Sequence, residues 1–178
     1  MNHKLTWDDL LIQSISPEIA ARCLAMWRPL VQGRVAPVFM SKFGDWFLRR
    51  PDGSTAELSV IGGTFKAIAG TSEEFSSCVN APEWQEVHLL SRQVYELHQR
   101  GLVPGPGQCY ALAPHPAFTG KIELGTIMLM DIPVWQSICA QLFTVGTTPT
   151  GEPGAAPTSG PGTRSGNSGA GGERPSVS

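Results

Sequence analysis

The spacing of hydrophobic residues predicts a helix within residues 16–33, near the start of the chain. Apolar side chains recur there at intervals of three and four residues, which is the period of one helix face. Ser16 followed by Pro17 is typical of a helix N-terminus, and Pro29 is expected to bend or end the helix. A shorter helix over residues 7–13, capped by Thr6, is predicted ahead of it.

The period then changes to two, the spacing of β-strands. Residues 42–50 and 54–63 flank the turn-forming pair Asp52-Gly53, so a β-hairpin is predicted. In its second strand Ala56, Leu58 and Val60 share one face.

Helical and strand patterns follow one another in the rest of the chain. Helices are predicted over 64–70, over 72–80 with Thr71 or Ser72 as cap, over 82–101 between Pro82 and Gly101, and over 132–143 with Asp131 as cap. One side of the 82–101 helix is expected to carry Trp84, Val87, Leu90, Val94 and Leu97. Strands are predicted over 108–114 and 126–131. This order predicts an α+β fold, a mostly antiparallel sheet with segregated helices, in a single domain.

The composition changes sharply at Gly146. Residues 146–178 hold nine glycines and five prolines, and no aromatic residue. Such a segment cannot bury enough apolar surface to offset the entropy of ordering it. The sequence therefore predicts a domain over 1–145 and a disordered tail over 146–178.

Charge and cysteine usage set limits on the partners. The net charge is −2, which provides no basic field to attract nucleic acid or an anionic membrane. The four cysteines form no close pair or CxxC motif, so neither a metal site nor any other cofactor site is predicted. The N-terminus has no signal-peptide pattern and no stretch is long and apolar enough to span a membrane, so a cytoplasmic protein is predicted.

The stretch "GLVPGPGQCYAL" at 101–112 resembles a phosphate-binding loop only in its glycines. A helix precedes it and a strand follows, which is the reverse of a P-loop, and its prolines have no N–H to offer a phosphate. It is interpreted as a corner between helix and sheet. Cys109 is interpreted as a buried structural residue; the alternative is a small enzyme that uses Cys109 as nucleophile together with a histidine.

The hairpin "FGDWFLRRPDGS" carries charged and aromatic residues close together. Its candidate partner-binding residues are Asp45, Trp46, Arg49, Arg50 and Asp52, because Trp and Arg are typical interface anchors. The simpler interpretation packs Phe43 and Phe47 inward and leaves the charges in solvent. No catalytic residue is predicted.

Two stretches together resemble a known family. They are "FGDWFLRRPDGS…ELSVIGGTFKAIAGTSEEF" and "GLVPGPGQCYALAPHPAFTGKIELGTIMLMDIPVWQSICAQL", which lie within residues 35–143. The matching features are the Gly-Asp-Trp/Phe hairpin, the Gly-Gln-Cys-Tyr strand start and the closing Met-Asp-(x)3-Trp-Gln-Ser-Ile-Cys-Ala-Gln-Leu helix. With these, the chain resembles the bacterial immunity proteins linked to type VI secretion DNase effectors, which carry a GAD-related segment and a C-terminal immunity domain.

The resemblance implies a cytoplasmic, non-enzymatic protein that binds and neutralises a secreted toxin, with a DNase effector as the candidate partner. It implies no catalytic residue. The alternatives are the cysteine-dependent enzyme and a general protein-interaction adaptor whose tail joined it to another module.

Overall fold

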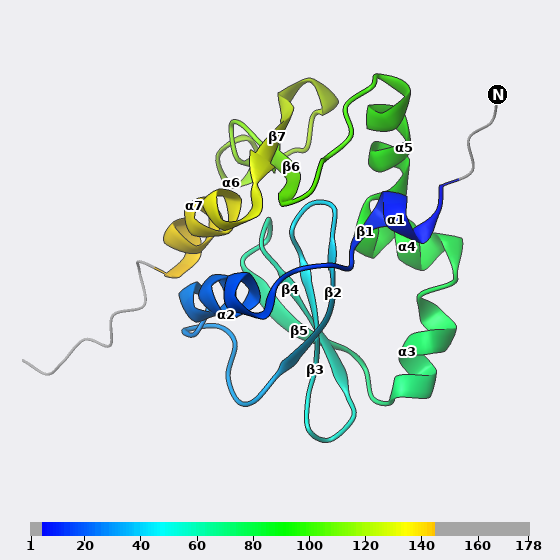
Figure 1. Ribbon diagram of the computed structural model, residues 1–178, viewed down its shortest axis with the longest axis vertical. Helices are drawn as coiled ribbons and strands as arrows, with labels where there is room; N and C mark the ends of the chain where they lie inside the picture. Colours follow the sequence, from blue (N-terminus) through cyan, green and yellow to red (C-terminus); the bar gives the residue numbers. More distant parts are fainter. Residues whose placement is uncertain (1–4, 145–178) are drawn as a thin grey trace, which may run out of the picture. The chain divides into compact units, whose positions relative to one another are not determined.

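The computed structural model describes residues 5–144, which form an α+β fold with two antiparallel sheets (Figure 1). The larger sheet has the strand order β1 (Leu11–Ile12), β2 (Ala36–Ser41), β3 (Trp46–Arg49), β4 (Thr55–Ser59), β5 (Thr64–Ala69). The smaller sheet pairs β6 (Gln108–Leu112) with β7 (Ile127–Asp131). The helices are α1 (Trp7–Leu10), α2 (Pro17–Met26), α3 (Ser72–Cys78), α4 (Pro82–Leu89), α5 (Ser91–Gln99), α6 (Pro116–Thr119), the short 3-10 helix η1 (Leu124–Thr126) and α7 (Ile132–Thr144). The predicted fold class is confirmed, and the predicted tail over 146–178 lies outside the described residues.

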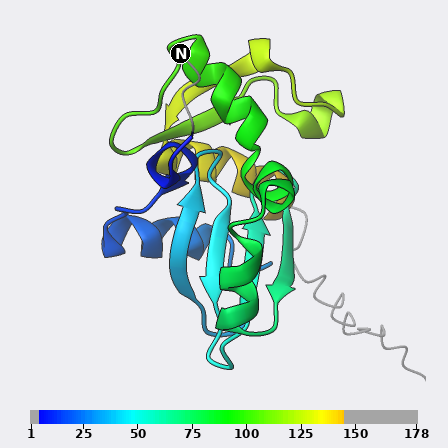
Figure 2. The ribbon, with the colours of Figure 1, turned by 90° about the vertical axis from the view of Figure 1, so that its right-hand side faces the viewer.

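Helices cover both faces of the larger sheet. Figures 1 and 2 show α2 and α7 together on one face and α3 and α4 on the other. The smaller sheet is joined to the turn between β2 and β3 by a backbone hydrogen bond from the N–H of Tyr110 to the carbonyl of Lys42, at 2.7 Å.

Side-chain caps fix where several helices begin. The hydroxyl of Ser16 accepts from the N–H of Ile19 at 3.2 Å, and that of Thr71 accepts from the N–H of Glu74 at 3.1 Å. Both predicted caps are therefore confirmed, and each satisfies a backbone donor that the first turn of a helix leaves without a partner. The predicted 7–13 helix ends early, at Leu10, because Leu11 and Ile12 pair with β2 instead.

Two helix predictions are wrong. Residues 64–69 form strand β5, paired along its length with β4, because completing the sheet outweighs the helix propensity of Lys66 and the alanines. The predicted 82–101 helix is broken at Leu90, whose φ of +52° is left-handed. The break changes which residues face the core: Val87 is 71% exposed, whereas Leu89 is fully buried.

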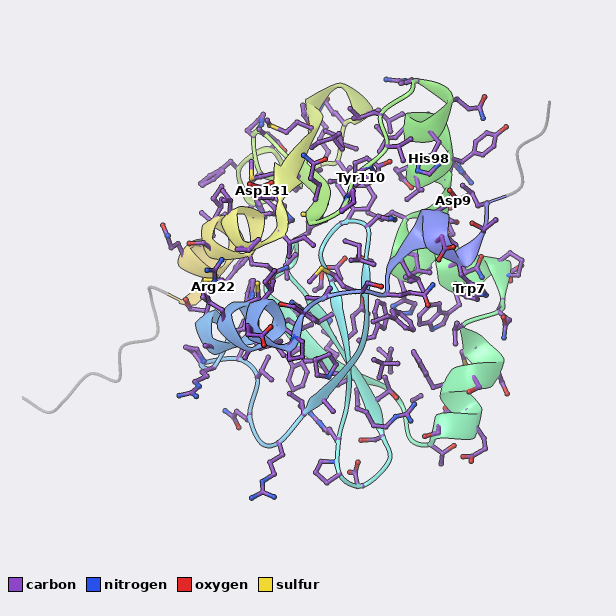
Figure 3. All side chains as sticks on the ribbon, viewed as in Figure 1. Trp7, Asp9, Arg22, His98, Tyr110 and Asp131 are labelled. Carbon is purple, nitrogen blue, oxygen red and sulfur yellow. The ribbon has the colours of Figure 1, made fainter. Side chains whose placement is uncertain are left out.

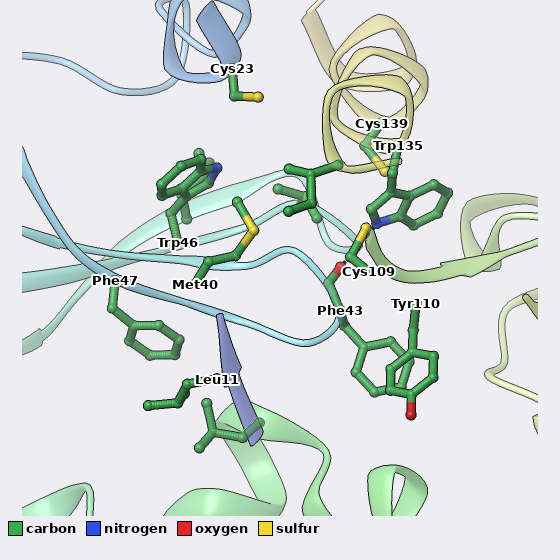
Figure 4. Packing of buried hydrophobic residues seen from close by; sticks show 14 of the residues in the cluster. Leu11, Cys23, Met40, Phe43, Trp46, Phe47, Cys109, Tyr110, Trp135 and Cys139 are labelled. Carbon is green, nitrogen blue, oxygen red and sulfur yellow. Dashed lines mark hydrogen bonds between the residues drawn. The ribbon is translucent and has the colours of Figure 1, made fainter. Parts of the chain in front are cut away.

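The core is one continuous hydrophobic cluster that includes residues of both sheets and of α2, α5 and α7. Figure 4 shows the part of it where Met40 and Trp46 of the larger sheet face Cys23 of α2, with Trp135 of α7 and Cys109 of β6 close by. Strands β1 and β2 were not predicted from the sequence, whereas the hairpin of residues 42–50 and 54–63 was, and it forms β3 and β4.

Candidate functional site

Two of the five predicted partner-binding residues are core residues. Trp46 is fully buried and Asp45 is only 5% exposed, so neither side chain is part of the surface, contrary to the prediction. Phe43 and Phe47 are also fully buried, as the simpler interpretation of the hairpin predicts. The physical reason is that β3 is a central strand, covered by helices on both faces.

The buried hairpin residues are bonded to the closing helix through Gln136. Its amide N–H donates to the carbonyl of Gly44 at 2.7 Å, and its Oε1 accepts from the indole N–H of Trp27 at 2.8 Å and of Trp46 at 3.1 Å. The neighbouring indole of Trp135 donates to the carbonyl of Phe43 at 2.9 Å. The Gly-Asp-Trp hairpin and the Trp-Gln helix, which carry the resemblance, thus meet in one buried network.

Asp45 has a structural role in the same region. Its Oδ1 accepts from the backbone N–H of Val60 at 2.7 Å, and Ser41 donates to its Oδ2 at 3.3 Å. Burial, together with the nearby charge of Glu57, raises the pKa of Asp45 to about 7. The carboxyl group therefore ties β2, the start of β3 and the end of β4 together rather than facing a partner.

The other three predicted residues do lie at the surface. Arg49 and Asp52 are exposed, and Arg50 is half-buried with its guanidinium 5.1 Å from the centre of the Phe65 ring. Asp52 accepts from the N–H and the hydroxyl of Ser54, at 2.9 and 2.6 Å, and these bonds lower its pKa. Asp52 therefore shapes the turn, and of the five predicted residues Arg49, Arg50 and Asp52 are the ones whose side chains reach the surface.

An apolar hollow of about 450 Å³ lies between α2 and β2. The hollow exists because β1 pairs with only two residues of β2, Met40 and Ser41. After Ile12 the chain leaves the sheet and continues to α2, so no described strand pairs with the rest of the outer edge of β2. The lining of the hollow is mainly aliphatic: Ile12, Gln13, Ile15, Pro17, Ala20, Ala21, Leu24, Val35, Pro37, Val38 and Phe39. Trp46 also borders the hollow but exposes no surface to solvent.

Arginines surround the continuation of this hollow. A second hollow, of about 470 Å³, shares Ala21, Leu24 and Val35 with the first and is lined also by Arg28 and Arg34. A third, of about 320 Å³, shares Arg34 and Val35 with the second and is lined also by Arg49 and Arg50. We call these three adjoining hollows the arginine groove.

The three exposed arginines of the groove form no ion pair with an acidic residue in the described part of the chain, whereas the charge of Arg50 helps to lower the pKa of Asp52. Arg28, Arg34 and Arg49 are exposed, and none of the ion pairs between described residues includes them or Arg50. From Ile19 to Pro51 the sequence holds a single acidic residue, the buried Asp45. The groove thus combines an apolar floor with unpaired positive charge.

The helices on the other face of the sheet, α3 and α4, are acidic. Helices α3 and α4 carry Glu73, Glu74, Glu83 and Glu86, and no lysine or arginine occurs between Lys66 and Arg92. Figure 3 shows Arg22 on α2 on one side of the sheet and Trp7 and Asp9 of α1 on the other. The glutamates are therefore concentrated on α3 and α4, and most of the described arginines lie between α2 and the end of β3.

The remaining chemical candidates do not assemble into a reactive group. Cys109 is fully buried, and burial followed by the charge of Asp45 raises the pKa of its thiol, which disfavours the thiolate. Within residues 5–144 no three His, Cys, Asp or Glu side chains are grouped so as to hold a metal ion. None of the described helices is long and apolar enough to cross a membrane.

The groove was missed by the sequence analysis. Its residues come from α2, the following loop, β2 and β3, and only folding brings them together. One signal was present in the sequence: five of the seven arginines in residues 5–144 fall between 22 and 50, with hardly any acidic residue among them.

Comparison with known proteins adds little to this description. The sequence matches no protein-family model and no curated protein at a significant level. A solved structure, that of Atu4351 from Agrobacterium tumefaciens, is similar with a TM-score of 0.42 and 18% sequence identity, over 70% of this chain. This chain spans 62% of that protein, and a likeness at this level says nothing of a shared function.

Proposed function

We propose that this chain is a non-enzymatic immunity protein, which binds and neutralises a secreted bacterial toxin of the type VI secretion class, with a DNase effector as the candidate toxin. The observation that carries the proposal is the arginine groove, an apolar surface with exposed arginines that have no acidic partner among the described residues. Arginine beside apolar surface is typical of protein interfaces, where it supplies anchoring contacts.

The resemblance to immunity proteins supports the toxin as the partner. Its segments lie within residues 35–143, which leaves out α1, β1 and α2, and two of its motifs contact each other through Gln136. This arrangement accounts for why these positions belong together in one fold. The choice of a bacterial toxin rests on the resemblance, and the choice of a protein partner rests on the surface.

The cysteine-dependent enzyme gains no support from the geometry. A nucleophilic cysteine needs a thiolate that a substrate can reach, whereas the thiol of Cys109 is fully buried with a raised pKa. The adaptor alternative predicts binding without protection from a toxin.

A growth test distinguishes these functions. The product of the gene adjoining this one is expressed in a bacterial host with the full chain, with the full chain carrying Cys109→Ser, or alone. We expect toxicity alone, rescue by both forms, and a stoichiometric complex after affinity purification. Absence of rescue and of a complex would refute this pairing, and rescue lost only in Cys109→Ser, with the fold intact, would favour the enzyme.

A further inference from the structure

We propose that the arginine groove binds one extended segment of the toxin, in which an apolar side chain is flanked by carboxylates. This inference rests on the proposed function and adds the surface used and the chemistry of the toxin segment. The aliphatic hollow would take the apolar side chain, and the arginines around its continuation would pair with the carboxylates.

The size and lining of the first hollow suit an apolar side chain. Its volume of about 450 Å³ lies within the range of small-ligand sites, roughly 300–1,000 Å³. Val38 at its edge is 38% exposed, and Ala36 and Pro37 beside it are exposed as well. An apolar side chain inserted between α2 and β2 would remove this surface from water, which favours binding.

The arginines determine the charge of the segment. Arg28, Arg34 and Arg49 are exposed and make no ion pair with any described residue, so a partner carboxylate would not have to displace an internal one. Guanidinium groups can bind carboxylates through two parallel hydrogen bonds, and this bidentate geometry also fixes the orientation of the carboxylate. A basic segment would instead place like charges together, which opposes binding.

The exposed edge of β2 is poorly suited to pairing with a strand from a second copy of this chain. Pro37 has no N–H to donate, and the register between β2 and β3 shifts between Pro37 and Phe39. Proline and bulges at a sheet edge are features that prevent strands from pairing edge to edge. The groove therefore offers side-chain contacts, and these fit a segment of a different protein.

A nucleic acid is a weaker match than an acidic peptide. The net charge of the chain is −2, and the opposite face carries the glutamates of α3 and α4, so the molecule as a whole does not attract a polyanion. A short acidic segment needs only the local pairs that the groove provides.

The test measures binding of the purified full chain to the product of the adjoining gene, carrying an inactivating substitution, by calorimetry at two salt concentrations. Two variants alter the groove: Arg34→Glu with Arg49→Glu reverses its charge, and Ala21→Trp fills it from the exposed side of α2. Two matched variants alter other exposed positions: Arg92→Glu with Arg100→Glu reverses the same number of charges on and after α5, and Val87→Trp adds a tryptophan on α4. Circular dichroism confirms that each variant is folded.

We expect the charge reversal to raise Kd by roughly 100-fold or more and Ala21→Trp to raise it by roughly 10-fold or more, with both control variants within about threefold of the wild type. The wild-type affinity should also fall as salt is raised, more steeply than that of the reversed variant.

Each contrary outcome has a distinct meaning. Wild-type binding that the groove variants keep would overturn this inference and leave the proposed function standing. No binding and no protection by the wild type would overturn both. Loss of binding in Val87→Trp rather than Ala21→Trp would place the interface on the acidic face. If the wild type sediments as a dimer that Arg34→Glu with Arg49→Glu dissociates, the groove binds a second copy of this chain instead. If the wild type binds a labelled DNA duplex tightly at about 0.15 M salt, the groove binds DNA instead.

Discussion

Replacing Gln136 by methionine should be among the most damaging single changes in this protein. Methionine keeps the length of the side chain but removes its amide, which makes three hydrogen bonds in the fully buried network of α7. The change leaves the indole N–H groups of Trp27 and Trp46, both fully buried, and the carbonyl of Gly44 without their partner.

The magnitude follows from the number of groups left unpaired. A buried polar group that loses its hydrogen-bond partner costs about 1–3 kcal/mol. For three groups, partly offset because the amide itself no longer has to be buried, we expect the free energy of unfolding to fall by about 3–6 kcal/mol. Whole domains are stable by about 5–15 kcal/mol, so this is a large share, and the melting temperature should fall by roughly 10–20 °C.

The assay is urea unfolding followed by circular dichroism, which does not depend on the altered environment of the tryptophans. The matched control is Gln141→Met on the exposed side of α7, where the amide N–H donates to the hydroxyl of Ser137, and a change within about 0.5 kcal/mol is expected. Trp46→Phe removes one of the orphaned donors, so the double variant with Gln136→Met should cost less than the sum of the two single changes, by about 1 kcal/mol or more. A loss below about 1 kcal/mol for Gln136→Met, or strict additivity in the cycle, would refute the view that this amide holds α7 to the sheet.

Three further predictions concern residues around the same core. The pKa of Asp45 in the folded protein, about 7, lies above its unfolded value of 3.8, so the folded state holds the proton more tightly. The free energy of unfolding should therefore fall between about pH 4 and 7 and then level off. Asp45→Asn, which keeps an acceptor for the N–H of Val60, should flatten this part of the pH profile when the urea midpoint is measured against pH. Gly44→Ala should destabilise by more than Gly53→Ala in thermal melts, because both glycines have positive φ but only at Gly44 would a Cβ come within 3.1 Å of Gln136 and Trp135. In native protein, a thiol reagent should modify the half-buried Cys78 well before Cys109, and equal rates at the two cysteines would contradict the burial of Cys109.

The parts of the fold that were predicted from the sequence depend on local chemistry. Ser16 and Thr71 cap their helices through bonds to residues three positions away, and the Asp52-Gly53 turn is closed by Ser54. The errors arose where distant parts of the chain decide the structure. Residues 64–69 become a strand because β4 is available for pairing.

The candidate site was partly predicted and partly corrected. Trp46 looked like an interface anchor because tryptophan and charge occur together in the hairpin, and nothing nearby in the sequence reveals its partner, Gln136, which is 90 residues away. Arg49 is exposed, as a partner-binding residue has to be, but the hollow that it lines lies beside Ala36 of β2, and β2 was not predicted.

The residues that carry the resemblance and those that would carry binding are different sets. Gly44, Asp45, Trp46 and Gln136 are buried and bonded, so changing them threatens the fold. Exposed arginines such as Arg34 have no partner within the described body, and substitutions of such surface residues usually cost less than about 0.5 kcal/mol of stability. A groove of this kind can therefore change its charge, and with it the segment it accepts, while the core stays the same. If the proposed function is correct, proteins that share this buried network need not share a toxin, and the identity of the toxin has to be sought in the exposed residues between Ala21 and Arg50 rather than in the motifs.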